Sequence, residues 1–181
     1  MGRINWTRFP LDKDLSGWHV FDADGTGGTV WSQEGNAVVG DARGRYDRVP
    51  LLVSDEGPWA DFELSMLLTP MPGSCNAQVV FRLNEAEGSF YLFDMLLGWQ
   101  AIAVSRVVRG RLTKSSVVNY PIEEGQEYDV EIAAREESLT SYVDGQLVNQ
   151  ATDGAIRSGA VGLSVWDSRT AYRDLRYRRI H

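Results

Sequence analysis

The chain is poor in the residues that form disulfides and metal sites. It contains one cysteine, Cys75, and two histidines in 181 residues. A single cysteine excludes an internal disulfide, so the core must be stable without one. His19 and His181 have no second histidine or cysteine near them in the sequence, which argues against zinc. A Ser-His-Asp site would have to use one of these two histidines, and no Gly-x-Ser-x-Gly motif is present. We therefore expect no metal and no cofactor.

Long apolar runs and an excess of positive charge are also absent. No stretch approaches the ~18 apolar residues that span a bilayer. No apolar run follows Arg3 and Arg8, so we see no secretory signal and expect a cytoplasmic protein by default, or a secreted one if a leader was removed. The net charge of −7 argues against nucleic acid or an anionic membrane as a partner. The oligomeric state stays open at this stage.

Alternation of apolar and polar residues dominates the chain. It runs through 61–66, 78–83, 129–132 and 160–166, in segments rich in β-branched and aromatic residues. Turn signals separate these segments; Asp144-Gly145, between 139–143 and 146–148, predicts a hairpin. Helix signals are poor, and no repeat or linker divides the chain. The sequence predicts one all-β domain over residues 1–181, an antiparallel sandwich or closed barrel.

Three polar residues lie on segments predicted to be strands. Asp94 interrupts the apolar run 90–96, where a buried charge without partners costs several kcal/mol. Alternation places Arg82 on the same face as Gln78, opposite the core. A register that the sequence does not fix decides whether Asp94 joins them. One interpretation is an exposed cross-strand ion pair; the other is a sugar site in which Arg82 and Asp94 bind hydroxyl groups.

Two aromatic residues extend the second interpretation. Trp166 falls on the outer face of its strand, in line with Gly162 and Ser164, and so offers a flat surface on which a sugar ring can stack. The alternative is a tryptophan that covers the end of a sheet. Tyr142 lies on the polar side of its strand and is placed on the same face as a rim residue. Trp99 and Gln100 are weaker candidates, and we expect Trp6, Trp18, Trp31 and Trp59 in the core or at strand ends.

The order of several short segments resembles the concanavalin A-like lectin/glucanase superfamily. They are Leu15-Ser16-Gly17-Trp18 near the start, Asp61-Phe62-Glu63-Leu64 and Val79-Val80-Phe81-Arg82 in the middle, and 142–148 and 158–163 near the end. Within that superfamily the chain resembles fructan-binding modules and the laminin G-like domains related to 3-keto-disaccharide hydrolases. The resemblance implies a two-sheet antiparallel jelly-roll sandwich with a ligand on or beside its concave sheet. Calcium is common in such sandwiches, but no acidic cluster here would plainly hold it.

These observations lead to one favoured function and two alternatives. We expect a carbohydrate-binding sandwich that recognises a terminal sugar or short oligosaccharide through Arg82, Asp94 and Trp166, with Tyr142 and Gln78 at the rim. One alternative is a glycoside-cleaving enzyme of the 3-keto-disaccharide hydrolase type, in which Asp94 is the first catalytic candidate. The Glu-x-Asp-x-x-Glu pattern of the related glucanases is absent. The other alternative is a protein-interaction sandwich.

Overall fold

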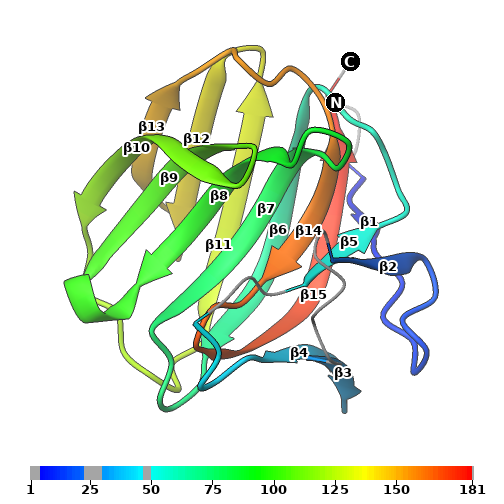
Figure 1. Cartoon of the computed structure of the whole chain (residues 1–181), viewed down its shortest axis with the longest axis vertical. Coiled ribbons are helices and arrows are strands. Elements are labelled where there is room, and N and C mark those ends of the chain that lie inside the picture. Colours follow the sequence, from blue (N-terminus) through cyan, green and yellow to red (C-terminus); the bar gives the residue numbers. More distant parts are fainter. Residues whose placement is uncertain (1–4, 23–29, 47–49, 181) are drawn as a thin grey trace.

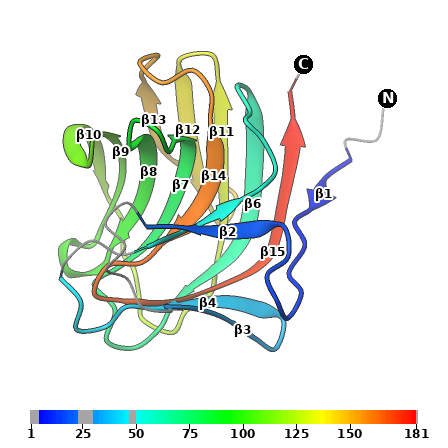
Figure 2. The same cartoon turned by 45° about the vertical axis from the view of Figure 1, so that its right-hand side comes forward.

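Two antiparallel sheets contain nearly all of the regular structure. The computed structural model describes residues 5–22, 30–46 and 50–180. In both views the sheets lie face to face, with the green strands in one layer and the yellow and red strands in the other (Figures 1 and 2). The only helical element among the described residues is the 3-10 turn η1 (Leu97–Trp99). The predicted all-β sandwich is confirmed.

One sheet has eight strands. Its order is β13-β12-β11-β6-β15-β4-β3, and β1 also pairs with β15. The strands are β1 (Thr7–Arg8), β3 (Trp31–Glu34), β4 (Ala37–Asp41), β6 (Phe62–Pro70), β11 (Tyr128–Arg135), β12 (Ser138–Val143), β13 (Gln146–Thr152) and β15 (Arg169–Arg179).

The other sheet has seven strands. Its order is β10-β9-β8-β7-β14-β5-β2. The strands are β2 (Trp18–Phe21), β5 (Leu51–Ser54), β7 (Asn76–Asn84), β8 (Ser89–Leu96), β9 (Ala101–Val108), β10 (Arg111–Asn119) and β14 (Ala160–Ser164).

The predicted strands and their best-marked turn are confirmed. The alternating segments of the sequence coincide with β6, β7, β11 and β14, except that Asp61 precedes β6 and Val165 and Trp166 follow β14. Asp144-Gly145 joins β12 to β13, and both residues have positive φ, 51° and 76°. This left-handed backbone suits the tight hairpin turn that the dipeptide predicts.

The core fills the space between the two inner faces. Val79, Phe81 and Phe93 of the seven-stranded sheet and Leu64 and Tyr172 of the eight-stranded sheet belong to one cluster and are all fully buried. The alternation therefore leaves every second residue of β7 and β8 on the outer face, the one turned away from the other sheet. That face carries the candidate site. In the described part of the chain, no helix has the length and apolar character needed to cross a membrane.

Buried tryptophans anchor one end of the core. Trp18, Trp31 and Trp59 are 8%, 6% and 4% exposed, as predicted. The Trp59 ring stacks on Tyr177 of β15 with centroids 4.4 Å apart, and Phe9 packs against the same tyrosine at 4.8 Å. These contacts bind the first and last described strands to the core.

Candidate functional site

A cavity lies on the outer face of the seven-stranded sheet, where β7 begins and β8 ends. Its volume is about 760 Å³, within the range of small-molecule sites. We call it the β7–β8 cavity. Its lining residues are Ser74, Cys75, Asn76, Gln78, Asp94, Leu96, Leu97, Gly98, Trp99, Gln100, Ile122, Glu124 and Trp166.

Asp94 lies at the centre of a short chain of polar side chains. The register pairs Asp94 of β8 with Gln78 of β7 and Ala103 of β9. The Gln78 amide donates to Asp94 Oδ2 at 3.0 Å, and the Ser164 hydroxyl donates to Gln78 Oε1 at 2.9 Å. Asp94 Oδ1 is buried and has no hydrogen-bond partner. An unpartnered buried carboxylate oxygen is costly, so it needs a donor from outside the described contacts.

Burial changes the protonation of this carboxyl group. Asp94 is only 8% exposed, and desolvation raises its pKa to about 7, against the weaker opposing effect of the Gln78 hydrogen bond. Among the residues that the structure describes, no basic side chain contributes to this pKa. Near neutral pH the group therefore accepts a hydrogen bond in one protonation state and donates one in the other.

The strands beneath the polar chain are held from the core side. The Tyr172 hydroxyl reaches across from β15 to the backbone carbonyls of Gln78 and Ser164, each at 2.8 Å. This contact fixes the spacing of β7 and β14 behind the polar groups. The Gln78–Asp94 geometry is thus preorganised, since both backbones are paired on either side.

Two exposed tryptophans border the cavity. Trp99 is 76% exposed and Trp166 is 43% exposed. The Trp166 indole donates to the Tyr46 carbonyl at 3.3 Å, and the Tyr46 ring meets it edge-on at 6.2 Å. Trp99 lies on η1, which Gln100 holds by donating to the carbonyls of Leu97 and Ile122. Gln100 therefore positions the turn, and its amide group is already hydrogen-bonded within the protein. The exposed indole rings of Trp99 and Trp166 are the surfaces that a ligand can contact.

The prediction that Arg82 faces outward beside Gln78 is wrong. The register of β7 is irregular between Phe81 and Asn84, and Arg82 has a φ of 49°, so its side chain turns inward and is fully buried.

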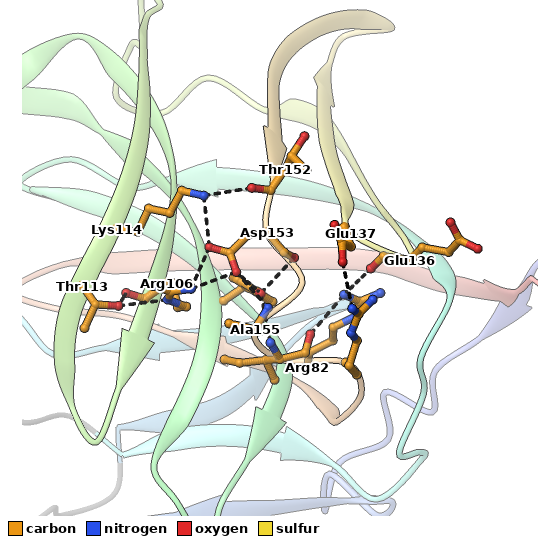
Figure 3. A network of polar contacts seen from close by, with 12 residues as sticks. Arg82, Arg106, Thr113, Lys114, Glu136, Glu137, Thr152, Asp153 and Ala155 are labelled. Carbon is orange, nitrogen blue, oxygen red and sulfur yellow. Dashed lines mark hydrogen bonds and ion pairs between the residues drawn. The ribbon is translucent and has the colours of Figure 1, made fainter.

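All of the contacts of the Arg82 guanidinium are internal. It donates to the carbonyls of Ala60 (2.8 and 3.0 Å), Glu136 (2.9 Å) and Ile156 (3.1 Å), as Figure 3 shows for Glu136. Its ionic contact is Asp61 at 3.3 Å. Arg82 thus stabilises the loops at one end of the sandwich and does not pair with Asp94.

A second ionic cluster lies beside Arg82 and is also structural (Figure 3). The Asp153 carboxylate contacts Arg106 at 3.0 Å, Lys114 at 3.3 Å and the Tyr91 hydroxyl at 2.8 Å. Although burial acts to raise it, the pKa of Asp153 is lowered by hydrogen bonds and by the positive charge of Arg106. The cluster joins the loop after β13 to β8, β9 and β10.

Tyr142 lies away from the cavity. It belongs to β12 of the eight-stranded sheet and borders a separate pocket of about 390 Å³, together with Glu63, Arg135 and Arg178. The predicted shared face with Trp166 is wrong, because Tyr142 lies on the eight-stranded sheet, whereas Trp166 follows β14 of the seven-stranded sheet. The structure therefore brings together Gln78, Asp94 and Trp166 and leaves Arg82 and Tyr142 outside.

Within residues 5–22, 30–46 and 50–180, no three histidine, cysteine, aspartate or glutamate side chains gather so that they could hold a metal ion. The sequence-based expectation of no metal and no cofactor stays a prediction.

Comparison with known proteins assigns the family. The sequence model of the 3-keto-alpha-glucoside-1,2-lyase-like domain matches residues 6–178. The chain belongs to this family. The family agrees with the resemblance seen in the sequence.

Solved structures with the same fold include two from Bacillus. A carbohydrate-binding module, CBM66, from Bacillus subtilis has a TM-score of 0.77 and 21% identity, covering 92% of this chain and 98% of that one. A Bacillus licheniformis beta-glucanase has a TM-score of 0.73 and 13% identity, covering 97% and 98%. The jelly-roll sandwich of the concanavalin A-like kind is confirmed.

A curated relative is larger. An extracellular exo-alpha-L-arabinofuranosidase from Streptomyces chartreusis is 31% identical over 135 residues, which cover 71% of this chain. The match spans only 15% of the length of that enzyme.

Proposed function

We propose that the β7–β8 cavity binds a carbohydrate. The observation that carries the proposal is the buried Asp94 Oδ1, which has no hydrogen-bond partner among the described residues, on a side chain that lines a cavity bordered by two exposed indoles. A sugar offers hydroxyl donors for the carboxylate and an apolar ring face for an indole. Charge-assisted hydrogen bonds of this kind are about twice as strong as neutral ones.

Each cavity residue then has a defined part. Asp94 accepts from a sugar hydroxyl through Oδ1, and Gln78 keeps the carboxylate in place through Oδ2. Trp166 or Trp99 stacks on the ring, since an indole adds a flat apolar surface with little loss of side-chain freedom. The cavity volume of about 760 Å³ suits a terminal sugar or a short oligosaccharide.

The relatives support this proposal by their names. A carbohydrate-binding module, a beta-glucanase and an arabinofuranosidase are all proteins of carbohydrate recognition or cleavage. Because the arabinofuranosidase is extracellular and much longer than this chain, we also propose that the domain works outside the cell. A signal peptide found upstream in the gene would support export.

A glycoside-cleaving enzyme is the second candidate, favoured by the Asp94 pKa of about 7 and by the family. A keto group at C3 of a sugar acidifies the hydrogen at C2. Asp94 as carboxylate would take that proton, and the C2–H electrons would form a C1=C2 double bond. The C1–O bond would break with its electron pair on the leaving oxygen, which would take up a proton from water. A base whose pKa lies near the working pH suits this step.

A thermal-shift and product assay separates the candidates. A ligand at 10 mM with a dissociation constant of ~0.1–1 mM adds roughly 1.4–2.7 kcal/mol, or about 3–10 °C in Tm. The panel contains four classes of ligand: neutral sugars, amino sugars, acidic sugars and 3-keto-glycosides. We expect one of these classes alone to raise the Tm. The double variant Trp99→Ala/Trp166→Ala should abolish the shift, whereas Tyr142→Ala, on the other sheet, should not.

Each outcome has a defined meaning. A shift without product supports binding alone. Product that disappears in Asp94→Asn, with binding retained, supports the enzyme. No shift with any sugar would overturn both and leave a protein-interaction sandwich, for which a complex or dimer in solution is the measurable sign.

A further inference from the structure

The β7–β8 cavity is unusual in the sign of its charge. Its described lining includes two carboxylates, Asp94 and Glu124, and no lysine, arginine or histidine. A third carboxylate, Asp167, lies at the rim with Oδ2 3.4 Å from Cys75 Sγ. The pKa of the Cys75 thiol is raised by burial and then by the negative charges of Asp167 and Glu124. The rim thus has a negative potential.

The neighbours of Asp94 are uncharged on every side. Gln78 of β7 and Ala103 of β9 flank it in register, and Ser164 of β14 continues the hydrogen-bonded chain. Behind the sheet, Tyr172 of the opposite layer is close enough for the charge of Asp94 to raise its pKa, and its hydroxyl bonds to backbone carbonyls. The charge of Asp94 therefore lacks a counter-ion among the described residues. Buried carboxylates are ordinarily paired or bound to a metal.

We propose that the cavity selects its sugar by charge and prefers an amino sugar, whose ammonium group contacts Asp94 Oδ1. This inference rests on the proposed carbohydrate binding and names the class of sugar. An ammonium group supplies both the missing counter-charge and three hydrogen-bond donors. The indole faces of Trp99 and Trp166 also attract a cation, which adds to the preference. Sugars with a carboxylate or sulfate are excluded, because their charge would meet Asp94 and Glu124.

A matched set of ligands tests the proposal. Isothermal titration at about pH 7 compares the 2-amino sugars of gluco, galacto and manno configuration with their hydroxyl and N-acetyl counterparts and with the uronic acids. In the preferred configuration we expect the amino sugar to bind at least tenfold more tightly than the hydroxyl sugar. The uronic acid should show no binding. The preference should shrink as salt is added, since screening weakens charge interactions.

Proton release gives a second readout. A cation at Oδ1 stabilises the ionised form of Asp94, so binding lowers its pKa and releases part of a proton to the buffer. Titrations in two buffers of different ionisation enthalpy measure this release. The Asp94→Asn variant should release none and bind the amino and hydroxyl sugars within about twofold of each other. Glu87→Gln, exposed in the turn between β7 and β8 and outside the lining of the cavity, is the control and should keep the preference.

The outcomes separate the inference from the proposed function. If the hydroxyl sugar binds as tightly as the amino sugar, charge selection is wrong and carbohydrate binding stands. If Asp94→Asn keeps the tenfold preference, the ammonium group is not at Asp94 and the inference is overturned. If no sugar of any class binds the wild-type protein, both fail together.

Discussion

Replacing Asp94 by asparagine removes a buried charge while keeping the size and shape of the side chain. The wild-type carboxyl group has its pKa raised from 3.8 to about 7 by desolvation. Each pKa unit corresponds to about 1.4 kcal/mol, so the ionised group costs the folded state about 4 kcal/mol relative to the unfolded chain. The asparagine still accepts the Gln78 hydrogen bond through its own oxygen.

The sign of the pH dependence follows from proton binding. Between pH 3.8 and about 7 the folded protein holds a proton on Asp94 that the unfolded chain has lost. Stability therefore falls as pH rises through this window, and the full cost is present above it. Asp94→Asn lacks this ionisable group, so its free energy of unfolding does not decrease for this reason. The variant therefore becomes more stable relative to the wild type as pH rises.

Urea denaturation at pH 5.5 and pH 8.5 measures the effect. The difference in the free energy of unfolding between Asp94→Asn and the wild type should increase by about 2 kcal/mol from pH 5.5 to pH 8.5, in favour of the variant. This is the part of the about 4 kcal/mol cost that develops above pH 5.5. The m-value should not change, because the same surface is exposed on unfolding.

Asp153→Asn is the matched control. The Asp153 pKa is lowered in the folded state, so its charge stabilises the fold above the unfolded pKa and is lost as pH falls through the folded value. This variant should be less stable than the wild type at both pH values, by about 3 kcal/mol, because Arg106 and Lys114 lose their shared partner.

An advantage of Asp94→Asn that stays constant from pH 5.5 to 8.5 would refute the argument from desolvation.

Three further predictions concern the frame around the cavity. Arg82→Met leaves buried carbonyl groups without donors and should lower the free energy of unfolding by at least about 3 kcal/mol in urea; a loss below about 1 kcal/mol would contradict its structural role. Gly159→Ala would place a Cβ 2.3 Å from the Arg82 carbonyl carbon and should cost at least about 2 kcal/mol, whereas Gly98→Ala meets no atom within 4 Å and should stay within about 0.5 kcal/mol. Gln78→Leu removes the hydrogen bond that lowers the Asp94 pKa, so carboxyl titration followed by NMR should move upward; a downward move would contradict this assignment.

The fold was predictable because it depends on local patterns. Alternation with a period of two marks the strands, and Asp144-Gly145 marks its hairpin by needing positive φ. The same alternation predicts which side chains of each strand point into the core. No long-range information is needed for these steps.

The site was predictable only at positions where the local alternation of the strand held. Gln78 and Trp166 lie on the outer face as expected, and the register joins Asp94 to Gln78. Alternation failed at Arg82, because a bulge with φ of 49° on a non-glycine residue leaves no signal in the sequence. Such a conformation is set by distant groups, here the carbonyl groups that the guanidinium binds.

The assignment of strands to sheets was beyond sequence reasoning. Tyr142 has the polar-side pattern of a rim residue, but β12 pairs with β11 and β13 in the eight-stranded sheet. A pattern along one strand does not say which sheet it joins. The exposed Trp99 was noted only as a weak candidate, since nothing local shows that β8, η1 and β9 place it beside Asp94.

The pairing of β1 with β15 has a consequence for attachment. Thr7 lies opposite Tyr177 in register, so the described chain enters and leaves the domain at adjacent points. In Figure 1 these ends lie at the upper right and η1, which carries Trp99, lies at the lower left. A host protein could therefore carry this domain as an insertion with short connections, and a support linked to either terminus would leave the cavity open to solvent. Joining the ends by a short linker and opening the Asp144-Gly145 turn should likewise give a circular permutant that folds.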